Sequence, residues 1–392
     1  MKIELIATAT FGLEAVVRRE IEKLGYTVIR TEDGKVTYQG DERAIVRSNL
    51  WLRSADRVYI RIAEFEAVTF EELFQQVRGI EWERWIPLDG EFPVVGTSVK
   101  SVLHSVPACQ SIIKKAVVSR MSDFYCRPHF DESGARYRIR FAVLRNRFSL
   151  MIDTSGVGLH KRGYRVQDVA APMKETLAAA LIQLSYWKEG AMRQPGREND
   201  PPRLLVDTCC GSGTIPIEAA MMARNIAPGL NRRFASDEWE MIPESIWKEE
   251  RRKAYAAVDY DSELRILGYD IDGEAIESCR ANAEEAGVGE DIRFHVMDMR
   301  KFRAEEDYGI IITNPPYGER IGDQEAMDRI YRKFAEILAK RPTWSLFVIT
   351  TDRSIEEKVG RKADRRRKLY NGRLETQFYQ FHGLKPDRKQ RR

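Results

Sequence analysis

The second half of the chain is constrained most by a regular alternation of short apolar segments and segments with helical spacing. The apolar segments cover residues 203–207, 266–270, 292–297, 309–313 and 344–350, and the helical segments between them cover 215–223, 273–286 and 324–340. Strands that alternate with helices form a doubly wound, mainly parallel sheet. The sequence therefore predicts an α/β domain, closed by an antiparallel hairpin at the sheet edge about Asn371-Gly372.

The first half begins with a small α+β pattern. The segment KIELIAT is strand-like, LEAVVRREIEKLG has helical spacing that ends at Gly25, and a hairpin turns at Asp33-Gly34. This order indicates a ferredoxin-like unit. Further elements are predicted as helices at 42–53, 70–77 and 109–125, strands at 57–65 and 92–101, and a hairpin over 135–153. A basic, Gly-rich stretch at 154–166 indicates a linker, and a helix is predicted within 171–187.

The composition disfavours membrane, secreted and metal-binding classes. No apolar run approaches the roughly 20 residues that cross a bilayer, and the first residues are too short and too charged for a signal peptide. The five cysteines are odd in number and contain no C-x-x-C pair, which disfavours a disulfide framework and a zinc site. We therefore expect a cytoplasmic protein with reduced thiols and no metal.

Basic charge is concentrated in two parts of the chain. Residues 97–165 hold 13 Lys and Arg against 4 Asp and Glu, and residues 361–392 hold 12 against 3. Each part carries +9, whereas the whole chain carries only +4. A localised basic surface is typical of nucleic-acid binding. The alternative is a solvated face with a disordered tail, which is our interpretation of the final KPDRKQRR.

A glycine-rich turn follows the first predicted strand of the α/β half, in LLVDTCCGSGTIPIEAA. Glycines at such a turn let a ligand approach the backbone closely. The dinucleotide fingerprint is disfavoured because Pro216 stands near the place of its third glycine, and a phosphate loop is disfavoured because no lysine is present. The turn alone is equally consistent with packing.

The next three strands end in polar motifs at the same predicted edge of the sheet. Asp270 ends the second strand, where its carboxylate can accept both hydroxyls of a ribose, and Asp298 follows the third, where it can accept from an adenine amine. Asn314-Pro315-Pro316-Tyr317 follows the fourth. Since ligands bind beyond the carboxyl ends of such strands, this order predicts a nucleoside-binding site. Asp272 is interpreted only as a helix cap.

These motifs carry a family resemblance. DTCCGSGT, GYDID, MDMR and TNPPYGERIG resemble the ordered motifs of class I methyltransferases that use S-adenosylmethionine and act on exocyclic amines. GLHKRGYR, APMKETLAAALI and SVKSVLHSVPACQSIIKKA are similar, more narrowly, to bacterial THUMP-domain RNA methyltransferases of the ribosomal large-subunit type, which form N2-methylguanosine. The sequence departs from that pattern at Thr208-Cys209-Cys210, where relatives often carry proline after the aspartate.

The resemblance implies a fold and a division of the chain. It implies a seven-stranded, Rossmann-like methyltransferase sheet preceded by a ferredoxin-like unit and a THUMP domain. The corresponding ranges are 1–65 for the ferredoxin-like unit, 66–155 for the THUMP domain, 156–170 for a linker, 171–384 for the methyltransferase domain and 385–392 for a basic tail.

The motifs also assign residues. The expected cofactor-binding residues are Asp207, Cys209, Gly211, Gly213, Thr214, Asp270, Ile271, Asp298, Met299 and Asn314, and the expected catalytic residues are Asn314, Pro315, Pro316 and Tyr317. The expected RNA-binding residues are Lys100, Lys114, Lys115, Arg136, Arg138, Arg140, Lys161 and Arg162.

The N-P-P-Y motif suits an exocyclic base amine, whose lone pair is delocalised into the ring. If the Asn314 side-chain oxygen and the Pro315 carbonyl accept hydrogen bonds from its two N–H groups, the lone pair of the nitrogen is directed at the methyl group. Tyr317 can stack on a base that has been extruded from its helix or loop. We expect methylation of guanine N2 in structured RNA, with 23S ribosomal RNA favoured by the resemblance and transfer RNA open. The alternatives are methylation of adenine N6 in DNA or RNA, methylation of a protein glutamine, and an inactive RNA-binding or assembly factor.

Overall fold

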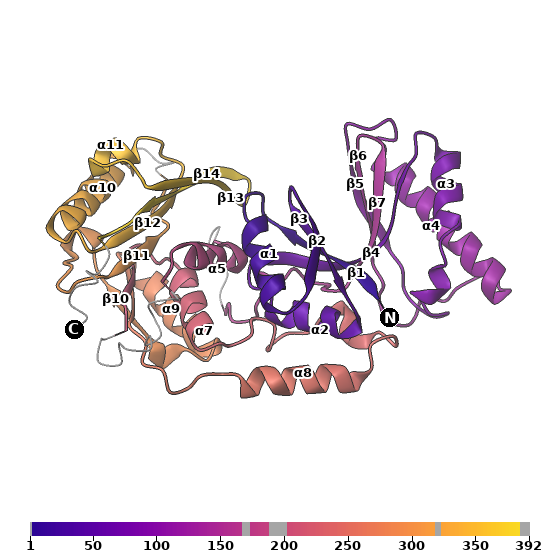
Figure 1. Ribbon diagram of the computed structural model, residues 1–392, viewed down its shortest axis with the longest axis horizontal. Helices are drawn as coiled ribbons and strands as arrows, with labels where there is room; N and C mark the ends of the chain where they lie inside the picture. The colour runs from indigo at the N-terminus through magenta and orange to yellow at the C-terminus, as the bar shows by residue number, and fades with distance from the viewer. Residues whose placement is uncertain (1, 167–172, 188–201, 318–322, 385–392) are drawn as a thin grey trace. The chain divides into compact units, whose positions relative to one another are not determined.

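The computed structural model describes residues 2–166, 173–187, 202–317 and 323–384 (Figure 1). The chain forms two compact units that are each made of several segments. Unit 1 contains Met1–Ala9, Val17–Leu159 and Arg232–Lys253, and unit 2 contains Thr10–Val16, His160–Asn231 and Ala254–Arg392. None of the described helices combines the length and apolarity that a bilayer crossing requires.

Unit 1 is built on one seven-stranded sheet, in the order β2-β3-β1-β4-β7-β6-β5. The strands are β1 (Ile3–Ala9), β2 (Thr27–Glu32), β3 (Lys35–Gly40), β4 (Ala55–Glu66), β5 (Val94–Val99), β6 (Ile139–Leu144) and β7 (Arg147–Asp153). The helices of this part of the chain are α1 (Glu14–Lys23), α2 (Glu42–Trp51), α3 (Phe70–Arg78) and α4 (Val106–Tyr125). These elements confirm the predicted order of strands and helices.

Strand β4 joins the two predicted parts of the first half. It pairs antiparallel with β1 at one edge and with β7 at the other. Because β4 is shared, the ferredoxin-like part and the THUMP part have one continuous sheet. In β6, Ile139 and Phe141 are buried whereas Arg140 between them is half-buried, so apolar and basic side chains alternate along this strand.

Residues 232–253 complete the core of unit 1, although they lie within the range predicted for the methyltransferase domain. Trp239 and Trp247 are buried in the same apolar cluster as the strands of this unit. The Trp239 ring stacks on Tyr137 with centroids 4.7 Å apart, and its Nε1 donates to the Arg136 carbonyl at 3.0 Å. The helix that follows, α8 (Glu244–Ala256), was not predicted from the sequence.

Unit 2 confirms the predicted doubly wound sheet, with seven strands in the order β10-β9-β8-β11-β12-β14-β13. The strands are β8 (Leu205–Asp207), β9 (Ile266–Asp270), β10 (Ile292–Val296), β11 (Ile310–Thr313), β12 (Ser345–Thr350), β13 (Arg365–Asn371) and β14 (Leu374–Phe381). Strands β8 to β12 are parallel, and the β13–β14 hairpin is antiparallel at one edge. All four residues of β11 are buried, as expected for a central strand covered on both faces.

Helices cover both faces of this sheet (Figure 1), and each set of helices packs on the sheet through its own apolar cluster. One contains α5 (Glu175–Leu184), α7 (Thr214–Ala223) and α9 (Gly273–Glu285), and the other contains α10 (Asp323–Lys340) and α11 (Ile355–Val359). Leu13 and Val16 are buried in the first cluster, so the short segment Thr10–Val16 is part of this unit.

Candidate active site

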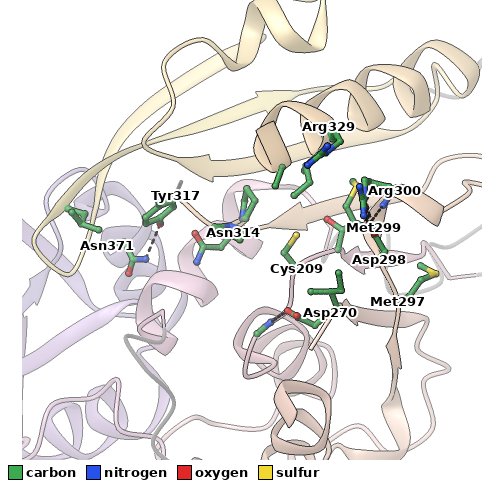
Figure 2. Close-up of a pocket in the computed structure, with 18 of the residues that line it drawn as sticks. Cys209, Asp270, Met297, Asp298, Met299, Arg300, Asn314, Tyr317, Arg329 and Asn371 are labelled. Carbon is green, nitrogen blue, oxygen red and sulfur yellow. Dashed lines mark hydrogen bonds and ion pairs between the residues drawn. The ribbon is translucent and has the colours of Figure 1, made fainter. Parts of the chain in front are cut away.

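A cavity of about 790 Å³ lies beyond the carboxyl ends of the parallel strands of unit 2 (Figure 2). Its lining includes residues that directly follow β8, β9, β10 and β11, together with the first turns of α10 and the tip of the β13–β14 hairpin. Its lining includes Cys209, Gly211, Asp270, Ile271, Met297, Asp298, Met299, Arg300, Asn314, Pro315, Pro316, Tyr317, Asn371, Gly372 and Leu374. This is the place where open α/β sheets bind ligands.

The glycine-rich turn after β8 forms one wall of the cavity. Gly211 and Gly213 have φ of +52° and +80°, in the left-handed region where a side chain is strained. A Cβ on Gly213 would lie 3.1 Å from Cys279 Sγ, so the turn also packs closely on α9. Backbone bonds hold it: Cys210 N donates to the Tyr269 carbonyl at 2.9 Å, and Gly213 N donates to the Cys210 carbonyl at 2.8 Å.

Asp270, at the end of β9, supports this turn and faces the cavity. Its Oδ2 accepts from Gly211 N at 2.8 Å, and its Oδ1 accepts from Asp272 N at 3.1 Å. A carboxylate offers about four acceptor positions, so about two remain for a ligand. Asp272 caps α9 by accepting from Glu274 N, as the sequence predicts.

Asp298, after β10, lines the same cavity but is engaged by its neighbour Arg300. The Arg300 Nε lies 2.7 Å from Asp298 Oδ2 and 2.9 Å from Oδ1, and the Arg300 backbone N donates to Oδ1 at 2.9 Å. Hydrogen bonding to Arg300 lowers the pKa of Asp298, so its carboxylate is charged at neutral pH.

Carboxylates at two strand ends, beside the apolar side chains of Ile271, Met297 and Met299, fit a ligand that combines hydroxyl and amine donors with an apolar ring. That chemistry is the one expected of the adenosine part of S-adenosylmethionine. No group of three or more His, Cys, Asp and Glu side chains is placed to hold a metal ion within the described ranges.

Asp207 supports the strand ends of the site without lining the cavity. Its buried Oδ1 accepts from Thr313 Oγ1 at 2.8 Å and from Cys209 N at 3.2 Å, which joins the end of β8 to the end of β11. Burial raises the pKa of Asp207 to about 7. Asp207, Gly213 and Thr214, all predicted to bind the cofactor, are not among the lining residues of the cavity, whereas the other predicted cofactor residues are.

The four residues of N-P-P-Y line the cavity together (Figure 2). The Asn314 Oδ1 is buried and has no hydrogen-bond partner in the described part of the chain. A buried acceptor without a partner is costly, so such an atom points to a missing donor. The Tyr317 hydroxyl accepts from Asn371 Nδ2 at 3.0 Å, which ties the motif to the β13–β14 hairpin.

A cluster around Arg165 was missed by the sequence analysis. The Arg165 guanidinium donates to Glu175 Oε1 at 2.7 Å, to Ser212 Oγ and Thr214 Oγ1 at 2.9 Å each, and to the Met173 carbonyl at 2.9 Å. It therefore joins the start of α5 to the glycine-rich turn. The basic residues of HKRGYR were the available signal, but they were assigned to a linker.

The structure gives Arg162 an internal partner, which argues against its predicted contact with RNA. Its side chain is 2% exposed and pairs with Glu218 of α7, whose side chain is fully buried, at 3.3 Å. The Tyr164 hydroxyl also donates to Glu218, at 3.3 Å. A guanidinium that is buried with its counter-ion has no face left for a phosphate. From His160 to Val166 the predicted linker is therefore part of unit 2, whereas its residues up to Leu159 belong to unit 1.

The other predicted RNA-binding residues remain predictions. In unit 1, Lys100, Lys115 and Arg136 are exposed, and Arg140 is half-buried. Lys114 pairs with Glu132 at 2.5 Å and Arg138 lies 3.8 Å from Asp153, so part of their charge is neutralised within the unit. Lys161 is exposed in unit 2.

Comparisons with known proteins agree with this architecture. Family models match residues 4–59 (RlmL ferredoxin-like domain), 67–153 (THUMP domain) and 162–380 (RMKL-like, methyltransferase domain). The chain is 44% identical to the putative RNA methyltransferase YpsC of Bacillus subtilis over 99% of this chain and 98% of that protein. It is 32% identical to the ribosomal RNA large subunit methyltransferase K/L of Syntrophotalea carbinolica over 97% of this chain, but spans only 53% of that longer protein.

Solved structures show the same fold. SMU.472, a putative methyltransferase complexed with SAH, is 43% identical and superimposes with a TM-score of 0.91 over 98% of this chain and 99% of that chain. A predicted N6-adenine-specific DNA methylase from Listeria monocytogenes is 46% identical, with a TM-score of 0.90 over 98% of this chain and 97% of that chain. The chain therefore belongs to the bacterial THUMP-domain RNA methyltransferases with an RMKL-like catalytic domain, and its cofactor is S-adenosylmethionine.

Proposed function

We propose that this protein methylates the exocyclic N2 amine of a guanine in 23S ribosomal RNA. The observation that carries the proposal is the buried Asn314 Oδ1, an acceptor without a partner among the described residues, inside the cavity at the strand ends of unit 2. An exocyclic base amine supplies the missing donor. The similarity to a ribosomal RNA large subunit methyltransferase supports the choice of RNA.

The residues of the motif have separate tasks in this proposal. S-adenosylmethionine supplies a methyl group on a positively charged sulfur. Asn314 Oδ1 and the Pro315 carbonyl accept hydrogen bonds from the two N–H groups of the amine. These two bonds orient the lone pair of the amine nitrogen toward that methyl group. Transfer of that methyl group would leave the C–S electron pair on the cofactor's sulfur, and the methylated amine would lose a proton to water. Positioning supplies most of the rate, and Tyr317 stacks on the extruded base.

A strain that lacks the gene provides the test of the substrate. Mass spectrometry of nucleosides from its 23S ribosomal RNA should show one N2-methylguanosine fewer than the parent. Purified protein with labelled cofactor should restore that nucleoside in RNA from the deletion strain. Restoration of N6-methyladenosine would instead support the adenine alternative, which the name of the Listeria relative favours. Methylation of transfer RNA alone would refute the ribosomal assignment.

The Asn314→Ala variant tests the motif. Loss of one preorganised polar contact to a reacting group costs on the order of 10² to 10³ in rate, so single-turnover methyl transfer should slow by that factor. The shift in melting temperature that the cofactor causes should be retained, because Asn314→Ala leaves Asp270 intact. Transfer at the parental rate would show that Asn314 does not hold the amine.

The cytoplasmic location stays a prediction.

A further inference from the structure

The β13–β14 hairpin is the most basic described part of unit 2. Residues 361–375 carry seven Lys and Arg against two Asp and Glu, and four of the basic residues are consecutive in β13. Of these, Arg365, Arg366 and Lys368 are exposed. Arg373, at the turn between the strands, is exposed as well.

The tip of this hairpin is part of the cavity. Asn371, Gly372 and Leu374 line it, and Asn371 Nδ2 donates to the Tyr317 hydroxyl at 3.0 Å. Figure 2 shows Asn371 and Tyr317 at one end of the cavity, Asp298 and Arg300 at the other, and Asn314 between them. Since the carboxylates belong to the cofactor end, the hairpin end is the one at which a base can enter.

Basic side chains of the β13–β14 hairpin remain available to bind a phosphate. Lys368 pairs with Glu375 at 2.7 Å and Arg366 pairs with Glu356 at 3.4 Å, but both basic side chains are exposed to solvent, which weakens these pairs. Arg373 has no ion-pair partner among the described residues. It stands in the turn between Gly372 and Leu374, which both line the cavity, although Arg373 itself is not among the lining residues.

One exposed and one half-buried aromatic ring lie beside these basic groups. Phe11 is 46% exposed and packs edge-on against Tyr370 of β13, with ring centroids 6.3 Å apart. Lys368 Nζ lies 5.5 Å from the centre of the Tyr370 ring. Surfaces that bind single-stranded nucleic acid combine basic groups with aromatic rings in this way.

We infer that the β13–β14 hairpin binds the RNA backbone beside the extruded nucleotide, with Arg373 at its tip contacting a phosphate. This inference rests on the proposed function, because it takes RNA as the occupant of the cavity entrance. A base that leaves its helix brings its two flanking phosphates to the entrance, and a cation there offsets their charge. The hairpin thereby positions the substrate directly at the catalytic motif.

A charged edge strand has another use, which is to prevent pairing with strands of other molecules. That use explains the basic residues within β13, but not Arg373. Arg373 lies in the turn, where no ladder can form. A substitution at Arg373 therefore separates the two explanations without changing the edge of the sheet.

The test compares Arg373→Glu with Lys340→Glu in the full chain. Lys340 carries the same charge, its side chain is 72% exposed, and its pair with Glu336 at 2.8 Å is exposed as well. It ends α10, ten residues beyond the last lining residue of that helix, or about 15 Å along its axis. The probe is labelled 23S ribosomal RNA from the deletion strain, measured by filter binding at several salt concentrations. Arg373→Glu should weaken binding about tenfold, whereas Lys340→Glu should change it less than twofold.

Two further readouts define the contact. Arg373→Ala should reduce the slope of log affinity against log salt by about one, as expected for one lost phosphate contact, and Arg373→Lys should restore most of the affinity. The cofactor-induced shift in melting temperature should be unchanged in all variants. Equal binding by Arg373→Glu and Lys340→Glu would overturn the inference. Because this readout is binding, it decides the role of the hairpin even if the methylated nucleotide proves not to be guanine.

Discussion

Asp270 provides the sharpest test of the cofactor end of the cavity, through the change Asp270→Ala. The carboxylate already accepts from Gly211 N and Asp272 N, and it has about two acceptor positions left for the ribose hydroxyls. The variant therefore loses two ligand bonds and one support of the glycine-rich turn. We expect weaker binding of S-adenosylmethionine.

The magnitude follows from the kind of bond. A hydrogen bond to a charged group contributes about 1.5 to 3 kcal/mol, so two contribute about 3 to 6 kcal/mol. Asp270 is half-buried, and water competes for its oxygens, which favours the lower end of that range. Since 1.4 kcal/mol corresponds to a tenfold change, we expect the Kd for the cofactor to rise by about 100-fold.

Isothermal titration calorimetry with S-adenosylmethionine measures this Kd, and Asp272→Ala is the matched control. Asp272 is two residues away and exposed, and its side chain caps α9. Loss of that cap costs about 0.5 to 2 kcal/mol of stability, but it should leave the Kd for the cofactor within about threefold of the parent. A Kd for Asp270→Ala that stays within threefold of the parent would refute the assignment of Asp270 to the ribose.

Two further predictions concern stability. Burial raises the pKa of Asp207 to about 7, above the value of about 3.9 in an unfolded chain, so the folded state keeps a proton that the unfolded state releases as pH rises from about 4 to 7. Relative to Asp207→Asn, the parent should therefore lose about 2 to 3 kcal/mol of unfolding free energy between pH 5 and pH 8. Denaturant titrations at several pH values measure this free energy, and the same pH dependence in the parent and in Asp207→Asn would contradict the prediction. Trp239→Ala should destabilise unit 1 by about 3 to 5 kcal/mol. Trp239→Phe keeps a ring that stacks on Tyr137 but loses the hydrogen bond to the Arg136 carbonyl, so it should cost about 1 kcal/mol. Equal urea midpoints for the two variants would show that the ring stacking contributes little.

Local patterns predicted the elements that depend on local chemistry. Strand β9 has the predicted bounds, and the first hairpin turns at Asp33-Gly34 as the sequence indicates, whereas the second turns at Gly372-Arg373, one residue later than the predicted Asn371-Gly372. Both glycines adopt positive φ, which is the property that made the turns recognisable. The order of polar residues after consecutive strands likewise predicted that Asp270, Asp298 and Asn314 line one cavity, because parallel strands end at one edge of the sheet.

Contacts between distant segments could not be predicted in the same way. Trp239 packs on Tyr137, about 100 positions away in the chain, and nothing in its own neighbourhood distinguishes it from a residue of the second unit. Arg162 stands in a basic, Gly-rich stretch that looks exposed, but it is buried against Glu218. Whether a charged side chain is buried depends on a partner elsewhere in the chain, and the local pattern of residues does not contain that partner.

The two strand-end carboxylates are not equivalent, although the sequence gives each the same kind of position. Asp298 receives the backbone N and the guanidinium of Arg300, which occupy about all four of its acceptor positions. An amine that binds Asp298 must therefore displace Arg300, whose side chain is 49% exposed and can be solvated by water instead. Asp270 requires no such exchange because its two protein donors are backbone N–H groups that leave acceptor positions open. The ribose contact at Asp270 is thus the one for which the folded chain is already arranged, and it should contribute more to cofactor affinity than the contact at Asp298.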